Sequence, residues 1–325
     1  MMDEVSVRQG ELLVAFLPDE LVGVVQDITP INEGLSGAGV YAVTTSRGAY
    51  VLRVQPPELA EDNFIQQLRV MRRAAEAEIA PRLVHVDEAA RAVVSERVQG
   101  MPVSAALANP ADRPRVLGSV IEQLRRLHAL DTTGITRQEP LPYTRKIWEA
   151  QRARPGFPAW ASDLGPIFGA IAPLLEADAR FTLNHNDVNP GNVLWDGTRA
   201  WLIDWEACGV GHPYFDLACL ALFLRLDEAT AFALAERHDG VSLTDASRAS
   251  FRALRKLAGL HCGLNILGAA KDLSGGTAAS IAEAPTLAAC YEGMFSGRLP
   301  LQSQAGLLAF GQALLALGVT APLSD

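Results

Sequence analysis

Cysteine is scarce in this sequence, and its copies stand far apart. The four residues, Cys208, Cys219, Cys262 and Cys290, form no Cys-x-x-Cys pair. This spacing argues against a zinc site and against a disulfide framework. A reducing compartment is therefore the simplest setting for the chain.

Long apolar runs and a basic N-terminal stretch are also missing. No apolar run approaches the length of a membrane span. The sequence starts MMDEVSVRQGELLVAF, with acids where a signal peptide carries basic residues. Together these features predict a cytoplasmic protein with no membrane partner.

Basic residues are too few and too scattered to suggest binding of nucleic acid. The chain has 28 Lys and Arg against 37 Asp and Glu, for a net charge of −9. Contacts to a phosphate backbone need clustered cations, so no nucleic-acid partner is expected. The acid excess fits a cationic or neutral partner, although such an excess more commonly serves solubility alone.

The residues that are present change their pattern near residue 100. Before that point, four short β-branched segments are separated by turn residues, which predicts a small antiparallel sheet. These segments are residues 40–45, 50–54, 82–86 and 92–96. Between them, residues 61–79 carry apolar side chains at helical spacing and stop before Pro81, so one helix is expected on the sheet.

Beyond residue 100 the periodicity becomes helical. One apolar stripe runs through Val116, Val120, Ile121, Leu124 and Leu127, and another through Phe251, Leu254, Leu257 and Leu264. The 325 residues are enough for two apolar cores. The sequence therefore predicts an α+β fold, with a sheet-rich N-terminal lobe followed by a larger, mainly α-helical C-terminal lobe.

Within the helical part, residues 193–205 read as a hairpin. Asp196-Gly197 is a strong signal for a two-residue turn. Such a turn would pair Trp195 with Thr198. Counting outward then places Asp204 opposite roughly Asn189, at the mouth of the hairpin.

Polar side chains gather around this predicted mouth. Asp187, Asn192 and Asp204 would supply two carboxylates and an amide. Asn192 and Asp204 offer the hard oxygen ligands that Mg²⁺ prefers, which leaves Asp187 to accept a proton from a substrate hydroxyl or to orient it. Glu206 shares a strand face with Asp204, so it would support the metal or touch substrate. Trp205 faces the other way, where core packing is the ordinary role and stacking on a quaternary ammonium the alternative.

The segments H-N-D-V-N-P-G-N (185–192) and L-I-D-W-E (202–206) resemble a known enzyme superfamily. They look like the H-x-D-x-x-P-x-N and I-D-W/F-E elements of the aminoglycoside phosphotransferase and choline kinase superfamily, closest in motif to bacterial choline-kinase-like members. The resemblance implies a two-lobed protein-kinase-like fold that uses ATP and Mg²⁺. It also implies that Asp187 is the catalytic base and that Asn192 and Asp204 bind the metal.

Weaker resemblances follow in the same order along the chain. Residues 33–43 resemble a nucleotide-covering hairpin, and residues 50–54 resemble the strand with the phosphate-binding cation. Residues 95–103 resemble the hinge between lobes, and residues 123–130 and 211–218 also resemble segments of the superfamily. They imply a nucleotide-binding lobe at residues 1–98 and a catalytic, substrate-binding lobe at residues 99–325. The implied cofactor-binding residues are Ser36, Gly37, Gly39, Arg53, Ser95, Arg97 and Val98.

Two positions depart from the pattern of the superfamily. Arg53 stands where kinases usually have Lys, although an Arg can also hold phosphate oxygens. The helix position where a Glu is expected to pair with this cation falls near Gln66 or Gln67. The ion pair is therefore absent or comes from another acid such as Glu58 or Glu61.

A third departure is His212, where the superfamily usually has Asp. It affects a loop contact more than the chemistry, because the positions of the base and the metal are intact.

The expected activity is transfer of the γ-phosphoryl group of ATP to a hydroxyl of a small molecule. Choline or ethanolamine is the first candidate, and an aminoglycoside, thiamine, homoserine or a sugar is an alternative acceptor. A nucleotide-binding pseudokinase without catalysis is a second class of function. A metal-dependent hydrolase fits less well, because it gives the N-terminal segment no role. The sequence does not indicate an oligomeric state.

Overall fold

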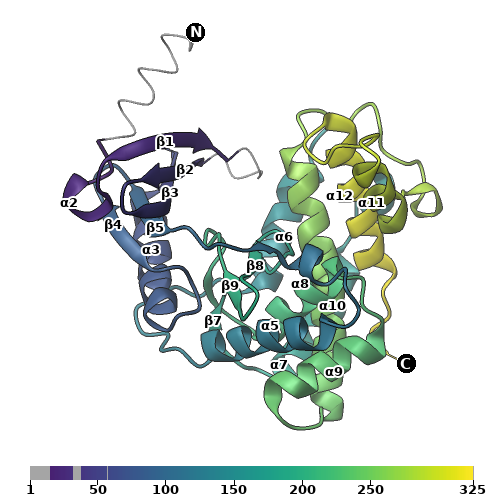
Figure 1. Cartoon of the computed structure of the whole chain (residues 1–325). Helices are drawn as coiled ribbons and strands as arrows, with labels where there is room; N and C mark the ends of the chain where they lie inside the picture. Colours follow the sequence, from purple (N-terminus) through teal and green to yellow (C-terminus); the bar gives the residue numbers. More distant parts are fainter. Residues whose placement is uncertain (1–14, 32–37, 57, 325) are drawn as a thin grey trace. The chain divides into compact units, whose positions relative to one another are not determined.

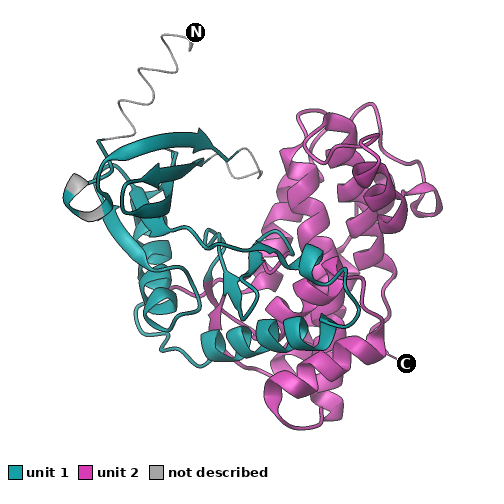
Figure 2. Ribbon diagram, viewed as in Figure 1, with its two compact units in different colours: residues 1–135, 190–208 teal, residues 136–189, 209–325 magenta. Residues whose placement is uncertain are grey.

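The computed structural model describes residues 15–31, 38–56 and 58–324, and the chain divides into two compact units (Figures 1 and 2). Unit 1 comprises residues 1–135 and 190–208, and unit 2 comprises residues 136–189 and 209–325. The segment that carries the predicted catalytic motif therefore passes from unit 2 into unit 1 and back. The functional boundary at residue 98 stays a prediction.

Unit 1 is built on a five-stranded antiparallel sheet with the strand order β1-β2-β3-β5-β4. Its elements are α2 (Asp19–Val22), β1 (Val25–Pro30), β2 (Gly39–Thr45), β3 (Gly48–Val54), α3 (Glu61–Glu76), β4 (Leu83–Asp87), β5 (Ala92–Glu96), β6 (Met101–Pro102), α4 (Val103–Ala106), α5 (Arg113–His128), β8 (Val193–Trp195) and β9 (Ala200–Leu202). Strands β2 to β5 and helix α3 confirm the predicted sheet with one helix.

Apolar side chains of this sheet belong to two clusters. One includes Val43 and Leu52, together with Leu17 from the segment before the first strand. In the other, Phe64 and Leu68 of α3 pack with Val93 of β5. The helix that the apolar spacing predicts thus covers the sheet, and α3 is visible against the strands in Figure 1.

The first strand, β1, was not expected from the sequence. It lies at the edge of the sheet and pairs only with β2. Its burial pattern shows no alternation between inside and outside, and it ends at Pro30, which an edge strand tolerates. Its sequence, VQDITP, likewise does not alternate between apolar and polar residues, so the period-two signal of a half-buried strand is missing from β1.

The hairpin at 193–205 exists, but its predicted register was wrong. Trp195 pairs with Ala200, not with Thr198. The cause is the side chain of Asp196, whose Oδ1 accepts hydrogen bonds from the backbone N–H groups of Thr198 and Arg199 at 2.7 and 2.8 Å. The turn is thereby centred on Gly197-Thr198, with Gly197 at a φ of 97°.

Unit 2 is mainly helical. Its elements are α6 (Pro140–Gln151), η1 (Ala159–Ala161), α7 (Gly165–Ala177), β7 (Thr182–Asn184), β10 (Gly209–Gly211), α8 (Tyr214–Phe223), α9 (Glu228–Asp239), α10 (Asp245–Ala269), η2 (Ile281–Glu283), α11 (Leu287–Phe295) and α12 (Gln304–Thr320). Strands β7 and β10 form a short antiparallel pair. With the sheet of unit 1, this helical unit confirms the predicted α+β class.

Helices α10 and α12 pack backbone against backbone. A Cβ added to Gly263 would lie 2.5 Å from the backbone nitrogen of Leu315, and one added to Gly318 would meet the backbone of Leu260. Glycine is required at such positions because any side chain would separate the two helices. The predicted stripe on α10 is buried, with Phe251, Leu254, Leu257 and Leu264 fully inaccessible to solvent.

In the ranges that the structure describes, no helix combines the length and the apolar character that crossing a membrane requires.

Candidate active site

The predicted nucleotide-binding residues that the structure describes all belong to unit 1. Gly39 begins β2, Arg53 lies near the end of β3, and Ser95 lies in β5 directly beside β3. Arg97 continues from β5 and donates its backbone N–H to the carbonyl of Ala49 at 3.0 Å. The sheet thus aligns these segments, and Val98 follows Arg97. Ser36 and Gly37 lie outside the described residues.

Arg53 contacts two carboxylates of the D-W-E segment. Its Nη1 lies 2.7 Å from Oδ1 of Asp204, and its Nη2 lies 2.8 Å from Oε2 of Glu206. The Arg53 side chain is only 16% exposed, so these contacts are partly shielded from water. The sequence left open whether Arg53 has a carboxylate partner, such as Glu58 or Glu61, and the structure gives it Asp204 and Glu206.

The hairpin places Asn192 and Asp204 at its open end. The backbone N–H of Ile203 donates to the carbonyl of Asn192 at 3.0 Å, which continues the β8–β9 ladder by one pair. Asp204 is therefore opposite Gly191, and not Asn189 as the predicted turn implied. Asp204 also has a φ of 64°, a left-handed conformation that is uncommon for a residue with a side chain.

The donor set at this open end fits Mg²⁺. An amide oxygen from Asn192 and a carboxylate from Asp204 are hard ligands, and Mg²⁺ commonly takes one or two protein oxygens and completes its shell with phosphate and water. Across the described parts of the chain, no three His, Cys, Asp or Glu side chains gather into a metal cluster. The roles of Asn192 and Asp204 as metal ligands remain a proposal.

Asp187 lies in unit 2, on the loop that follows β7. Its Oδ1 accepts a hydrogen bond from the side-chain amide of Asn189 at 3.0 Å, and the side chain is partly accessible to solvent. Only four residues lie between Asp187 and Asn192 along the chain. The amide of Asn189 thus orients the Asp187 carboxylate, whose role as a base stays a prediction.

The start of this loop is held by buried polar contacts. The carboxylate of Asp216 accepts the backbone N–H groups of His185 and Asn186 at 2.9 and 2.7 Å. The side-chain amide of Asn184 donates to the carbonyl of His212 at 2.7 Å. Asp216 and His185 are both fully buried, so these contacts anchor the start of the loop away from solvent.

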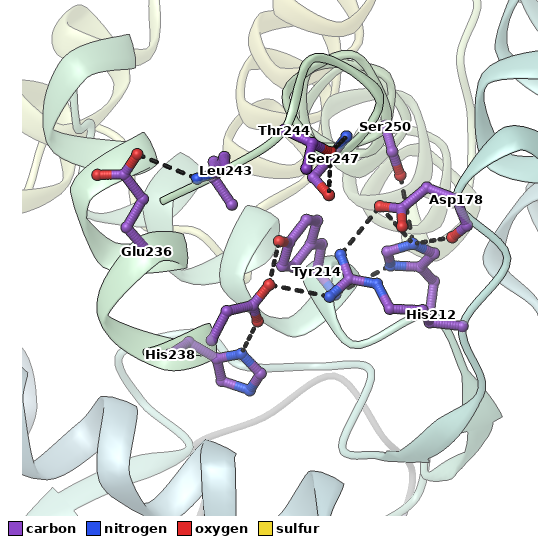
Figure 3. Close-up of polar contacts among 11 residues, drawn as sticks. Asp178, His212, Tyr214, Glu236, His238, Leu243, Thr244, Ser247 and Ser250 are labelled. Carbon is purple, nitrogen blue, oxygen red and sulfur yellow. Dashed lines mark hydrogen bonds and ion pairs between the residues drawn. The ribbon is translucent and has the colours of Figure 1, made fainter. Parts of the chain in front are cut away.

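His212 acts as an acceptor at the start of α8. Its Nδ1 lies 3.1 Å from the backbone nitrogen of Tyr214, which can only donate, so the proton of the neutral ring resides on Nε2. Nε2 then donates to the carbonyl of Asp178 at 3.0 Å (Figure 3). His212 thereby offers the acceptor that an Asp would offer to the Tyr214 N–H.

The surroundings of His212 form a network that the sequence did not reveal (Figure 3). Asp239 accepts hydrogen bonds from the hydroxyl of Tyr214, Nη1 of Arg180 and the ring of His238. Burial by itself would raise the pKa of Asp239, but these hydrogen bonds and the charge of Arg180 outweigh it and lower the pKa to about 2. Burial and the Asp239 contact raise the pKa of Tyr214 to about 12. These residues come from separate segments, so no local motif indicates the network.

The two tryptophans of the segment 201–205 have structural environments. Trp205 is 3% exposed, which supports core packing over a role in stacking on a ligand. Trp201 donates from Nε1 to Oδ2 of Asp196 at 2.8 Å, and the guanidinium of Arg199 lies over its ring. Trp201 therefore stabilises the hairpin, and Trp205 is a buried packing residue.

Comparisons with known proteins agree with this geometry. Residues 27–254 match the model of a family described as "Phosphotransferase enzyme family". A comparison with curated proteins found no match.

Among solved structures, a choline/ethanolamine kinase family protein from Mesorhizobium loti is similar over 97% of this chain and 94% of its own, with 19% identity and a TM-score of 0.70. The choline kinase LicA from Streptococcus pneumoniae is similar over 81% of this chain and 91% of its own, with 16% identity and a TM-score of 0.59. LicA has also been solved in complex with AMP.

Aminoglycoside phosphotransferase APH(3″)-Id from Streptomyces rimosus, in complex with ADP and streptomycin, is similar over 79% of this chain and 99% of its own. Its identity is 20% and its TM-score 0.55. The folds of these proteins and the predicted two-lobed kinase-like fold agree. The family match spans more than half of the chain, and the chain therefore belongs to the phosphotransferase enzyme family.

Proposed function

We propose that this protein is an ATP- and Mg²⁺-dependent kinase that transfers the γ-phosphoryl group to a hydroxyl of a small molecule. The contact between Nη1 of Arg53 and Oδ1 of Asp204, at 2.7 Å, supports this proposal most strongly. It joins the strand of the expected phosphate-binding cation to the carboxylate of the expected metal site, across 151 positions of sequence. Phosphoryl transfer in kinases uses a phosphate-binding cation and a metal-binding carboxylate around the same phosphates, and this contact brings the two together.

In this proposal each residue has one task. Ser95, Arg97 and Val98 line the adenine, while Gly39 belongs to the hairpin that covers the nucleotide. Arg53 binds phosphate oxygens, and Asn192 and Asp204 hold Mg²⁺, which when bound neutralises charge on the phosphates. Asp187 accepts the proton of the acceptor hydroxyl or orients that hydroxyl for attack. Catalysis then rests on positioning and charge neutralisation.

For the acceptor, we propose choline or ethanolamine first. The similar structures include a choline/ethanolamine kinase family protein and a choline kinase, and the net charge of −9 suits a cationic ligand. An aminoglycoside, thiamine, homoserine or a sugar is the alternative, since an aminoglycoside phosphotransferase has a similar fold. A cytoplasmic location, where ATP is abundant, belongs to the same proposal.

The contacts of Arg53 weaken the main argument for a non-catalytic pseudokinase. That alternative was motivated by the amides Gln66 and Gln67, which stand near the helix position where a Glu is expected to pair with Arg53. Asp204 and Glu206 both contact the guanidinium, so two carboxylates hold Arg53. We therefore favour catalysis over nucleotide binding alone.

The test is ADP release with MgATP across choline, ethanolamine, thiamine, homoserine, a sugar panel and aminoglycosides, with Asp187→Ala as the blank. We expect turnover with one acceptor class and a loss of at least about a hundredfold in the blank. Normal turnover by Asp187→Ala would contradict the assignment of Asp187 as the base. Thermal stabilisation by MgATP without any turnover would favour the pseudokinase.

A further inference from the structure

Two glutamines of α3 hold the backbone of the segment that follows Asp204. Nε2 of Gln67 donates to the carbonyl of Glu206 at 3.3 Å, and Nε2 of Gln66 donates to the carbonyl of Cys208 at 3.3 Å. Gln67 is buried, and its Oε1 accepts from the side chain of Gln55 at 3.1 Å. The helix therefore fixes this segment through amide groups.

From that fixed backbone, the carboxylate of Glu206 extends to Arg53. Its Oε2 lies 2.8 Å from Nη2, whereas Asp204 takes Nη1. The two carboxylates thus use different nitrogens of the same guanidinium, which the planar fork of an Arg permits. The Arg53 side chain is 16% exposed and that of Glu206 is 37% exposed.

We propose that Glu206 is the positioning residue for Arg53, and that Gln67 sets its place. This inference rests on the proposed function, in which Arg53 binds the phosphates of ATP. Asp204 has a second task there as a metal ligand, so Glu206 is the carboxylate that remains with Arg53 when Asp204 faces Mg²⁺. Its negative charge offsets the repulsion between the guanidinium and the metal.

The chemistry of residue 67 gives this proposal a sharp consequence. A Glu at this position would keep an acceptor for Gln55, but it would lose the donor to the carbonyl of Glu206 and place an anion against that oxygen. If the cation is held through Glu206, Gln67→Glu harms nucleotide binding. If Arg53 instead needs a carboxylate from α3, Gln67→Glu supplies one and improves nucleotide binding.

The experiment measures binding of MgATP and of adenosine to the full chain by isothermal titration calorimetry, without an acceptor. The variants are Glu206→Gln, Glu206→Asp, Gln67→Glu and the double variant Gln67→Glu/Glu206→Gln. The matched control is Glu88→Gln, because Glu88 pairs with Arg72 at 3.1 Å in the same unit on an exposed surface. Thermal melting of each variant monitors folding.

We expect Glu206→Gln to weaken MgATP binding about tenfold or more while adenosine binding and the melting temperature stay near wild type. Glu206→Asp restores part of the affinity, Gln67→Glu weakens MgATP binding, and Glu88→Gln binds as wild type. A merely structural role would change adenosine and MgATP binding together.

Two results overturn the inference alone: wild-type MgATP affinity in Glu206→Gln, or recovery of that variant by Gln67→Glu. A wild-type chain that binds neither MgATP nor adenosine overturns the proposed function itself, and the inference with it.

Discussion

The carboxylate of Asp216 accepts the backbone N–H of Asn186 at 2.7 Å in a fully buried environment. Asn186 has a φ of 64°, and the chain bends there, one residue before Asp187. The same carboxylate also accepts the N–H of His185. One buried side chain therefore fixes the backbone from which the proposed base extends.

From this relationship we predict that Asp216→Asn destabilises the fold. An Asn amide has a single oxygen, so one of the two backbone N–H groups would meet an NH₂ group and lose its acceptor. Leaving a buried donor unpaired costs about 1–3 kcal/mol. Urea unfolding measures the loss, and Asp245→Asn, at an exposed position in the first turn of α10, is the control. Equal stability of the two variants would contradict the anchoring role.

Substitution of the proposed metal ligand gives a second prediction. Asp204→Asn removes a charged oxygen donor, so we expect the Mg²⁺ concentration for half-maximal ADP release to rise about tenfold or more. The measurement is a Mg²⁺ titration at fixed ATP with the acceptor found by the panel. Asp62→Asn changes an exposed acid in the first turn of α3 and serves as the control. An unchanged Mg²⁺ requirement in Asp204→Asn would rule out this ligand.

The half-buried ring of His261 predicts a dependence of stability on pH. Burial lowers the pKa of His261 from 6.5 to about 4. Between these two values the unfolded chain binds more protons than the folded chain, so the free energy of unfolding falls as pH decreases from about 6.5 to about 4. The full effect is about 3 kcal/mol, because each pKa unit corresponds to about 1.4 kcal/mol.

Urea unfolding between pH 7.5 and 4 checks this dependence. We expect His261→Gln to flatten the curve across this window, while His85→Gln, which removes a ring from β4, serves as the control. His261→Gln with the slope of wild type would assign the pH dependence to other groups. The hydrogen bond between the His261 ring and the Thr144 hydroxyl, 2.9 Å long, suits the neutral ring that this argument requires.

The close pair α10–α12 predicts that Gly263→Ala destabilises unit 2. The new Cβ would lie 2.5 Å from a backbone nitrogen and 2.8 Å from the carbonyl of Gly311, so the helices must move apart at a cost of about 1–3 kcal/mol. The matched control is Gly169→Ala on α7, where a Cβ meets nothing within 4 Å. For Gly169→Ala we expect the free energy of unfolding to rise by up to about 1 kcal/mol, because Ala favours the helix more than Gly does. Thermal or urea unfolding of the two variants shows whether the changes in stability have these opposite signs.

Much of unit 1 could be predicted from the sequence because its signals are local. Strands β2 to β5 have β-branched residues between turns, and α3 has apolar residues at helical spacing. Strand β1 lacks such a signal because it lies at the edge of the sheet. The register of the hairpin was missed because the Asp196 side chain, rather than a backbone group, accepts the Arg199 N–H.

The candidate site was predictable where a motif carries it and unpredictable where distant segments meet. Asn192 and Asp204 stand at fixed spacing around one hairpin, so counting residues came within two positions of the pairing. The contact of Arg53 with Glu206 joins residues 153 positions apart, and no local pattern encodes it. The network around Asp239 likewise joins separate helices and loops of unit 2.

The burial of all four thiols provides natural probes of how each unit opens. Cys208 belongs to unit 1, and Cys219, Cys262 and Cys290 belong to unit 2. A thiol reagent reacts with a buried cysteine only after local opening, so the labelling rate reports the opening equilibrium. One variant would retain only Cys208 and another only Cys290. Their labelling rates, with and without nucleotide, would therefore report local opening of the two units separately.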